Sequence, residues 1–201
     1  MSHSWWYLSR AAGIVAWALL SASVIWGLAL STRVFDRKPS PKWFTDLHRF
    51  LGGTAVVFVA VHVGTIVADS YVHFGLADVL VPFASRWHPV AIAWGVVALW
   101  LIFAIEVSSL AMRFLPRRVW HAIHLSSYVL FVSATMHALA SGPDTRKQAF
   151  ELVLSAVLAV VTLLTLVRVV TPKRKGAARS RPSAPATRTP DAAPRVDAGA
   201  Q

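Results

Sequence analysis

Two apolar stretches of this chain carry histidines at two depths each. The first, Asp46 to Ala68, contains His48 and His62, which are 14 residues apart. Fourteen residues are close to four turns of an α-helix, so both rings leave nearly the same face, about 21 Å apart along the axis. Ionisable residues inside a membrane span are expensive and mark functional sites. The second stretch, residues 119–140, contains His121, His124 and His137.

Histidine pairs on two spans predict metal centres. Imidazole is the commonest metal ligand in proteins, and two stacked centres are most simply two haems, each held by two histidines. The chain has no cysteine. This excludes disulfides, thiolate-held iron–sulfur clusters and the CxxCH attachment of c-type haem. We therefore expect haem b, bound without a covalent link.

Depth within the two spans pairs the ligands. Both spans start on the same side of the membrane, so we expect an inner haem on His48 and His124 and an outer haem on His62 and His137, about 20 Å apart. His124 is preferred to His121 because its depth matches that of His48. The 13 residues from His124 to His137 put them about 140° out of phase on a straight helix. This span must therefore bend, or present its two rings around different sides of the haems.

Two other interpretations of the histidines remain open. Polar side chains inside spans can bond across helices, which would make the histidines structural. They could also form a path for a metal ion in a non-redox transporter. Such a path favours nearby carboxylates, and Glu106 is the one acid well inside a predicted span.

Four arginines are candidates to bind haem propionates, because a guanidinium group suits carboxylates. Arg49 and Arg117 belong to the inner end, and Arg86 belongs to the outer end. Arg10 enters the first span near its outer end, where an unpaired charge is costly, so a partner such as an outer propionate is expected.

The elements that must position these residues are membrane helices. Of the 201 residues, 56% are hydrophobic and only 14% are charged, a composition that indicates an integral membrane protein. We expect an all-α fold, a bundle of five transmembrane helices with about 20 apolar residues each. The predicted spans are roughly residues 5–30, 45–68, 90–112, 119–140 and 150–170.

Charges between the spans predict the orientation. Lys and Arg dominate loops 31–44 and 113–118 and the tail, which the positive-inside rule assigns to the cytoplasm, with the N-terminus outside and the C-terminus inside. The net charge of +11 is therefore attributed to topology and to attraction by membrane lipid, and no nucleic-acid partner is expected. The chain is expected to be multi-pass in the cytoplasmic membrane.

Two segments outside the spans have their own interpretation. Residues 75–83 are apolar but too short to cross, and we expect an interfacial or re-entrant segment that caps the outer end of the bundle. Residues 172–201 are rich in Ala, Arg and Pro, so we expect a disordered basic cytoplasmic tail after a haem domain of residues 1–171.

The motifs around these histidines resemble the ferric reductase-like transmembrane domain family. This superfamily includes NADPH oxidases, eukaryotic ferric reductases and the haem-bearing membrane subunit of bacterial methionine sulfoxide reductase systems. The matching motifs are LHRFLGG…AVH, which ends at His62, and WHAIHLSSY…MH, which contains His124 and His137. LSRAAG, around Arg10, also resembles the arginine motif of that family. The resemblance covers about residues 5–170.

The resemblance implies electron transfer through two b haems, from a cytoplasmic or quinol donor to an extracytoplasmic acceptor. It also supports His124 over His121 as a ligand. The chain lacks the C-terminal FAD and NADPH domain of the oxidases, so it is expected to be an oxidoreductase subunit whose donor is a separate flavoprotein or a quinol. Ile66 stands where NADPH oxidases carry a further histidine near the oxygen site, which argues against superoxide production.

Overall fold

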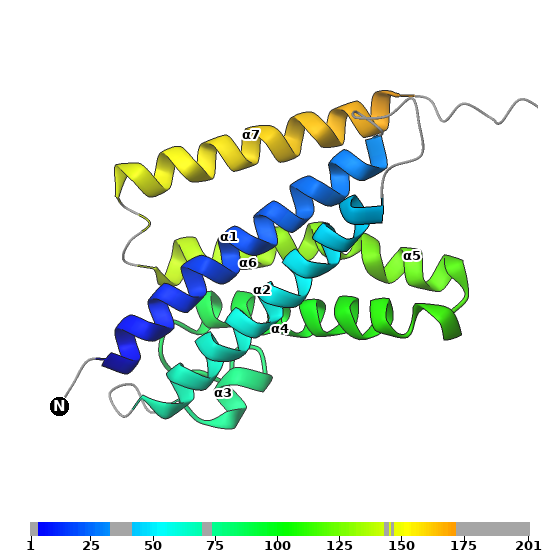
Figure 1. Cartoon of the computed structure of the whole chain (residues 1–201). Helices are drawn as coiled ribbons and strands as arrows, with labels where there is room; N and C mark the ends of the chain where they lie inside the picture. Colours follow the sequence, from blue (N-terminus) through cyan, green and yellow to red (C-terminus); the bar gives the residue numbers. More distant parts are fainter. Residues whose placement is uncertain (1–3, 33–41, 70–73, 143–144, 146, 172–201) are drawn as a thin grey trace, which may run out of the picture. The chain divides into compact units, whose positions relative to one another are not determined.

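The structure, a computed structural model, describes residues 4–32, 42–69, 74–142, 145 and 147–171, and its regular elements there are all helical. Five membrane spans were predicted, and five helical segments are long and apolar enough to cross a membrane (Figure 1). The predicted tail and most of basic loop 31–44 lie outside the described residues. The five segments are α1 (Ser4–Thr32), α2 (Lys42–Ala68), α4 (Pro89–Leu110), α5 with α6 (Arg117–Leu125 and Ser127–Ser141) and α7 (Gln148–Val170).

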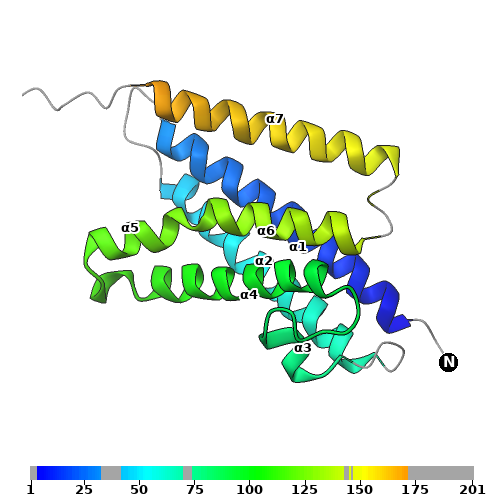
Figure 2. The ribbon, with the colours of Figure 1, turned by 180° about the vertical axis from the view of Figure 1, so that it is seen from behind.

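The bundle contains two antiparallel helix pairs. α1 packs along α2, and α4 packs along α6. α1 also contacts α6 and α7, and both views show α7 alongside α1 (Figures 1 and 2). The first helix, which carries no described histidine, is therefore a central element of the bundle.

Polar and aromatic contacts fix α1 to its neighbours. Trp17 donates a hydrogen bond from Nε1 to Thr135 Oγ1 on α6, at 3.1 Å and buried. The Trp17 ring also packs against Phe150 of α7, with 5.4 Å between ring centroids. Hydrogen bonds between spans are stabilising because few other partners exist in an apolar environment. A second core lies where α2, α4 and α6 meet, made of Ala55, Ala98, Ile102, Ile105 and Leu130.

The fourth span is broken between α5 and α6. The Ser126 hydroxyl donates to Ile123 O at 2.6 Å, and the helical ladder restarts with the bond from Leu130 N to Ser126 O. A serine that bonds back to its own helix often bends it. The sequence required a bend or rings on different sides, and the structure has the bend.

The short helix α3 (Leu76–Leu80) lies beside α4 along its length. Trp100 donates from Nε1 to Leu80 O at 2.9 Å. Trp100 is eleven residues into α4 from Pro89, which corresponds to about 16 Å of helix. The segment was expected to be interfacial or re-entrant and to cap the end of the bundle. Its position beside α4 favours the re-entrant form and shows that the expected cap over the end is wrong.

Candidate functional site

Four histidine rings meet in two pairs inside the bundle. His48 of α2 and His124 of α5 have ring centroids 6.0 Å apart, and His62 of α2 and His137 of α6 have centroids 6.2 Å apart. Both pairs have the same angle of 74° between ring planes. We call them the 48/124 pair and the 62/137 pair. Rings from two helices are thus brought together at each of two levels, in the combination expected from depth.

Both rings of the 62/137 pair are oriented by backbone carbonyls. Nδ1 of His62 donates to Ser9 O on α1, and Nδ1 of His137 donates to Ala91 O on α4, each at 2.8 Å. A carbonyl oxygen can only accept, so in both rings the proton is on Nδ1 and Nε2 keeps its lone pair. This is the tautomer that a metal-binding Nε2 requires.

The rings of the 48/124 pair are held differently from each other. His48 donates from Nδ1 to Ser23 O on α1, at 3.1 Å. His124 instead stacks on Trp120, one helical turn earlier, with centroids 5.1 Å apart and planes 24° apart. Its Nδ1 is buried and has no hydrogen-bond partner, and the same holds for Trp120 Nε1. Of the four rings, only His124 lacks an orienting carbonyl.

The three carbonyl-bound rings each lie against a glycine of the neighbouring helix. A Cβ at Gly13 would be 2.9 Å from His62 Nδ1, and one at Gly95 would be 2.8 Å from His137 Nδ1. A Cβ at Gly27 would be 3.1 Å from His48 Cε1. Each distance is shorter than ordinary van der Waals contact. These glycines therefore provide the space that lets an imidazole approach the helix backbone.

The sequence analysis missed these positioning residues. Ser9 and Gly13 repeat as Ser23 and Gly27, 14 residues later, which is the same interval that separates His48 from His62. A Ser-x₃-Gly pattern on one span, repeated at the spacing of the histidines on the next, was the signal that could have found them.

A cavity of about 240 Å³ adjoins the 62/137 pair. Both histidines line it, together with Gly13, Gly95 and Arg10. The walls include Asp78 and Val79 of α3 and Trp87 of the following loop, so the re-entrant segment closes one side of the cavity. The remaining lining is mostly apolar, as in sites for large flat cofactors.

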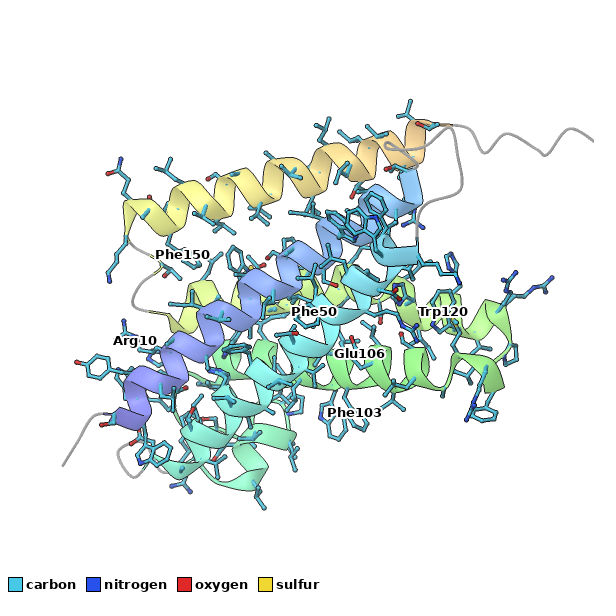
Figure 3. The ribbon with its side chains drawn as sticks, in the orientation of Figure 1. Arg10, Phe50, Phe103, Glu106, Trp120 and Phe150 are labelled. Carbon is cyan, nitrogen blue, oxygen red and sulfur yellow. The ribbon has the colours of Figure 1, made fainter. Side chains whose placement is uncertain are left out.

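The predicted arginines are placed unequally. Arg10 is half-buried at this cavity, with its guanidinium carbon 6.0 Å from the Trp6 ring (Figure 3). The side chains of Arg49, Arg86 and Arg117 are exposed and do not line the cavity. His121 is exposed, while His124 is half-buried and faces His48.

The acid inside a span, Glu106, lies against α2. A Cβ at Gly52 would be 2.7 Å from Glu106 Oε1. Figure 3 shows Glu106 between α4 and α2, whereas Phe103, three residues earlier, points away from the bundle and is largely exposed. Among the described residues, no group of three or more His, Cys, Asp or Glu side chains is arranged to hold a metal ion.

Comparison with known families gives one match. The model of the family "Ferric reductase like transmembrane component" matches residues 12–135, from the first cavity-lining turns of α1 to Thr135 in α6. The match covers more than half of the chain, and the protein belongs to this family of multi-pass membrane proteins. No curated protein and no solved structure matches the chain. Family membership indicates membrane electron transfer.

Proposed function

We propose that the protein is a di-haem b-type cytochrome that transfers electrons across the cytoplasmic membrane, as the membrane subunit of a reductase system. The 48/124 pair would hold the inner haem and the 62/137 pair the outer haem. The observation that carries this proposal is the meeting of two imidazoles from different helices at each of two levels.

The ring separations fit a haem iron between each pair. A metal–imidazole bond is about 2 Å long and the ring centroid lies about 1 Å behind the nitrogen, so two rings on opposite sides of one metal have centroids about 6 Å apart. The pairs have 6.0 and 6.2 Å. Two protein ligands at each site are also the number that a haem needs, because the porphyrin supplies the rest of the coordination.

The protein residues would set ligand chemistry at both sites. A haem bound by two imidazoles supplies a one-electron couple with no open position for substrate. Ser9, Ser23 and Ala91 carbonyls hold the proton of three rings on Nδ1 and so direct Nε2 inward. Hydrogen bonds of this kind also raise the basicity of the ligand.

The spacing of the two levels suits a path across the membrane. His48 and His62 are separated by about 21 Å of α2, which is most of the 30 Å hydrocarbon core of a typical bilayer. The proposed donor is a cytoplasmic flavoprotein or a quinol, and the proposed acceptor is extracytoplasmic. Arg10 is the arginine placed to serve a carboxylate at the outer level, since it lines the cavity there.

A spectrum of the purified protein tests the proposal. The expected result is a reduced-minus-oxidised difference with sharp b-type bands and two haems per chain by pyridine haemochrome assay and iron analysis. A colourless protein would overturn the proposal. If that protein bound zinc or iron in a manner lost with the histidines, the metal-path alternative would replace it.

A further inference from the structure

Helix α1 carries two copies of the same contact with α2. Ser9 and Gly13 contact His62, and Ser23 and Gly27 contact His48. The helices are antiparallel, so moving 14 residues forward on α1 corresponds to moving 14 residues back on α2. Two contacts that repeat in residue type and geometry at one interval indicate a common task at both levels.

The glycine of each copy is explained by the reach of the ring. In an α-helix the carbonyl of residue i points along the axis toward residue i+4. Gly13 is at i+4 from Ser9, and Gly27 is at i+4 from Ser23. An imidazole that donates to the serine carbonyl must therefore pass over the side-chain position of residue i+4. A glycine leaves that position open.

The serine of each copy adds a second acceptor at the ring. Ser9 Oγ lies 3.2 Å from His62 Nδ1 and donates to His62 O at 3.4 Å, so a lone pair is left for the ring N–H. Ser23 Oγ lies 3.3 Å from His48 Nδ1. Both serines are buried, with 3% and 8% of their surface exposed. More acceptors on Nδ1–H give the imidazole more electron density, which stabilises the oxidised form of a bound metal.

We infer that Ser9 with Gly13, and Ser23 with Gly27, are positioning residues that fix ring direction and set the reduction potential, each pair at one site. α1 thereby acts on both sites without supplying a ligand. This inference rests on the proposed function. The competing explanation is that the four residues are small only because α1 and α2 pack closely, as small residues do in many membrane helix pairs.

Serine-to-alanine variants separate the two explanations, because alanine keeps the small size and removes the acceptor. We expect Ser9→Ala to raise the midpoint potential of the outer haem alone and Ser23→Ala to raise that of the inner haem alone. Redox titration of the purified full-length protein measures both, and a His62→Ala or His48→Ala variant assigns each transition. The matched control is Ser21→Ala, because Ser21 is equally buried in α1 but bonds to Trp17 O of its own helix.

Glycine variants give a second readout. Gly13→Ala is expected to lower haem content at the outer site or to change the low-spin signals of that haem in electron paramagnetic resonance. Gly64→Ala is its control, because a Cβ there would meet nothing within 4 Å.

Three results would overturn the inference. Unchanged potentials in both serine variants with full haem content would leave close packing as the explanation. An equal shift in Ser21→Ala would indicate a general displacement of α1, and a shift of both haems in either variant would contradict the pairing. Each of these leaves the cytochrome intact. A wild-type protein without haem would instead remove the proposed function.

Discussion

The 62/137 pair and the 48/124 pair share a ring separation but differ in how the rings are held. At the 62/137 pair, both rings donate to a backbone carbonyl and both lie against a glycine. At the 48/124 pair, only His48 has these contacts, and His124 stacks on Trp120 with its Nδ1 unpaired. The same ring geometry is therefore reached in one case by contact with rigid backbone and in the other by aromatic stacking.

The break in the fourth span accounts for the difference. The interval from Ala91 and Gly95 to Ala104 and Ser108 on α4 equals the 13-residue interval between His137 and His124. Ser108 is buried and donates to Ile105 O of its own helix, so that position does not offer the open backbone that Gly95 does. His124 sits on α5, beyond the break, and takes its support from its own turn of helix. We expect the 62/137 site to be the more rigid of the two.

The largest expected effect comes from removing one ligand. His137→Ala should abolish the haem at the 62/137 site and leave the other spectroscopically visible, so haem content should fall by half. His124→Ala should do the converse. Persistence of both haems in either variant would show that the pairing is wrong.

A smaller but still severe effect is expected from Gly95→Ala. The added Cβ would be 2.8 Å from His137 Nδ1 and Cε1, and overpacking of this kind costs about 1–3 kcal/mol. We expect reduced haem retention at the 62/137 site alone, measured by haem loss to a soluble acceptor. Gly53→Ala, where a Cβ meets nothing within 4 Å, should retain both haems.

Removing the aromatic support should affect the other site more mildly. Trp120→Leu keeps an apolar side chain but removes the stacking partner of His124, an interaction of about 0.5–1.5 kcal/mol. Haem retention at the 48/124 site should fall several-fold while the 62/137 site is unchanged. Equal loss at both sites would contradict the view that Trp120 supports only one of them.

The smallest effect separates two adjacent glycines. Gly52→Ala pushes against Glu106 Oε1 and should lower stability by about 1–3 kcal/mol, whereas Gly53→Ala should be neutral or stabilising by up to about 1 kcal/mol because alanine favours helix. Thermal unfolding in detergent compares the two. Similar melting temperatures would show that Glu106 can move aside without cost.

Much of this arrangement follows from the sequence. Apolar length predicts the five spans, and the depth of His48, His62, His124 and His137 predicts which rings meet. The 13-residue interval predicts the bend, because a straight helix could not turn both rings toward α2. These features depend on helix periodicity and bilayer thickness, which act on each span separately.

The contacts that fix the rings were not predicted, for a physical reason. Ser9 and Gly13 contain nothing that marks them as different from ordinary small residues of a membrane helix until α1 and α2 are aligned. The stacking of Trp120 on His124 and the approach of Glu106 to Gly52 likewise depend on helix rotation. The position of α3 depends on one bond from Trp100 to Leu80 O, which no periodicity encodes.

The common 14-residue interval also limits how this protein can change in length. A single residue inserted between Gly13 and Ser23 would rotate the rest of α1 by about 100°, so one of the two copies would lose its histidine. The insertion could be accommodated only by a matching one between His48 and His62, because α1 and α2 then remain in register. We expect length differences among homologues to be absent from these two intervals and to gather in the loops.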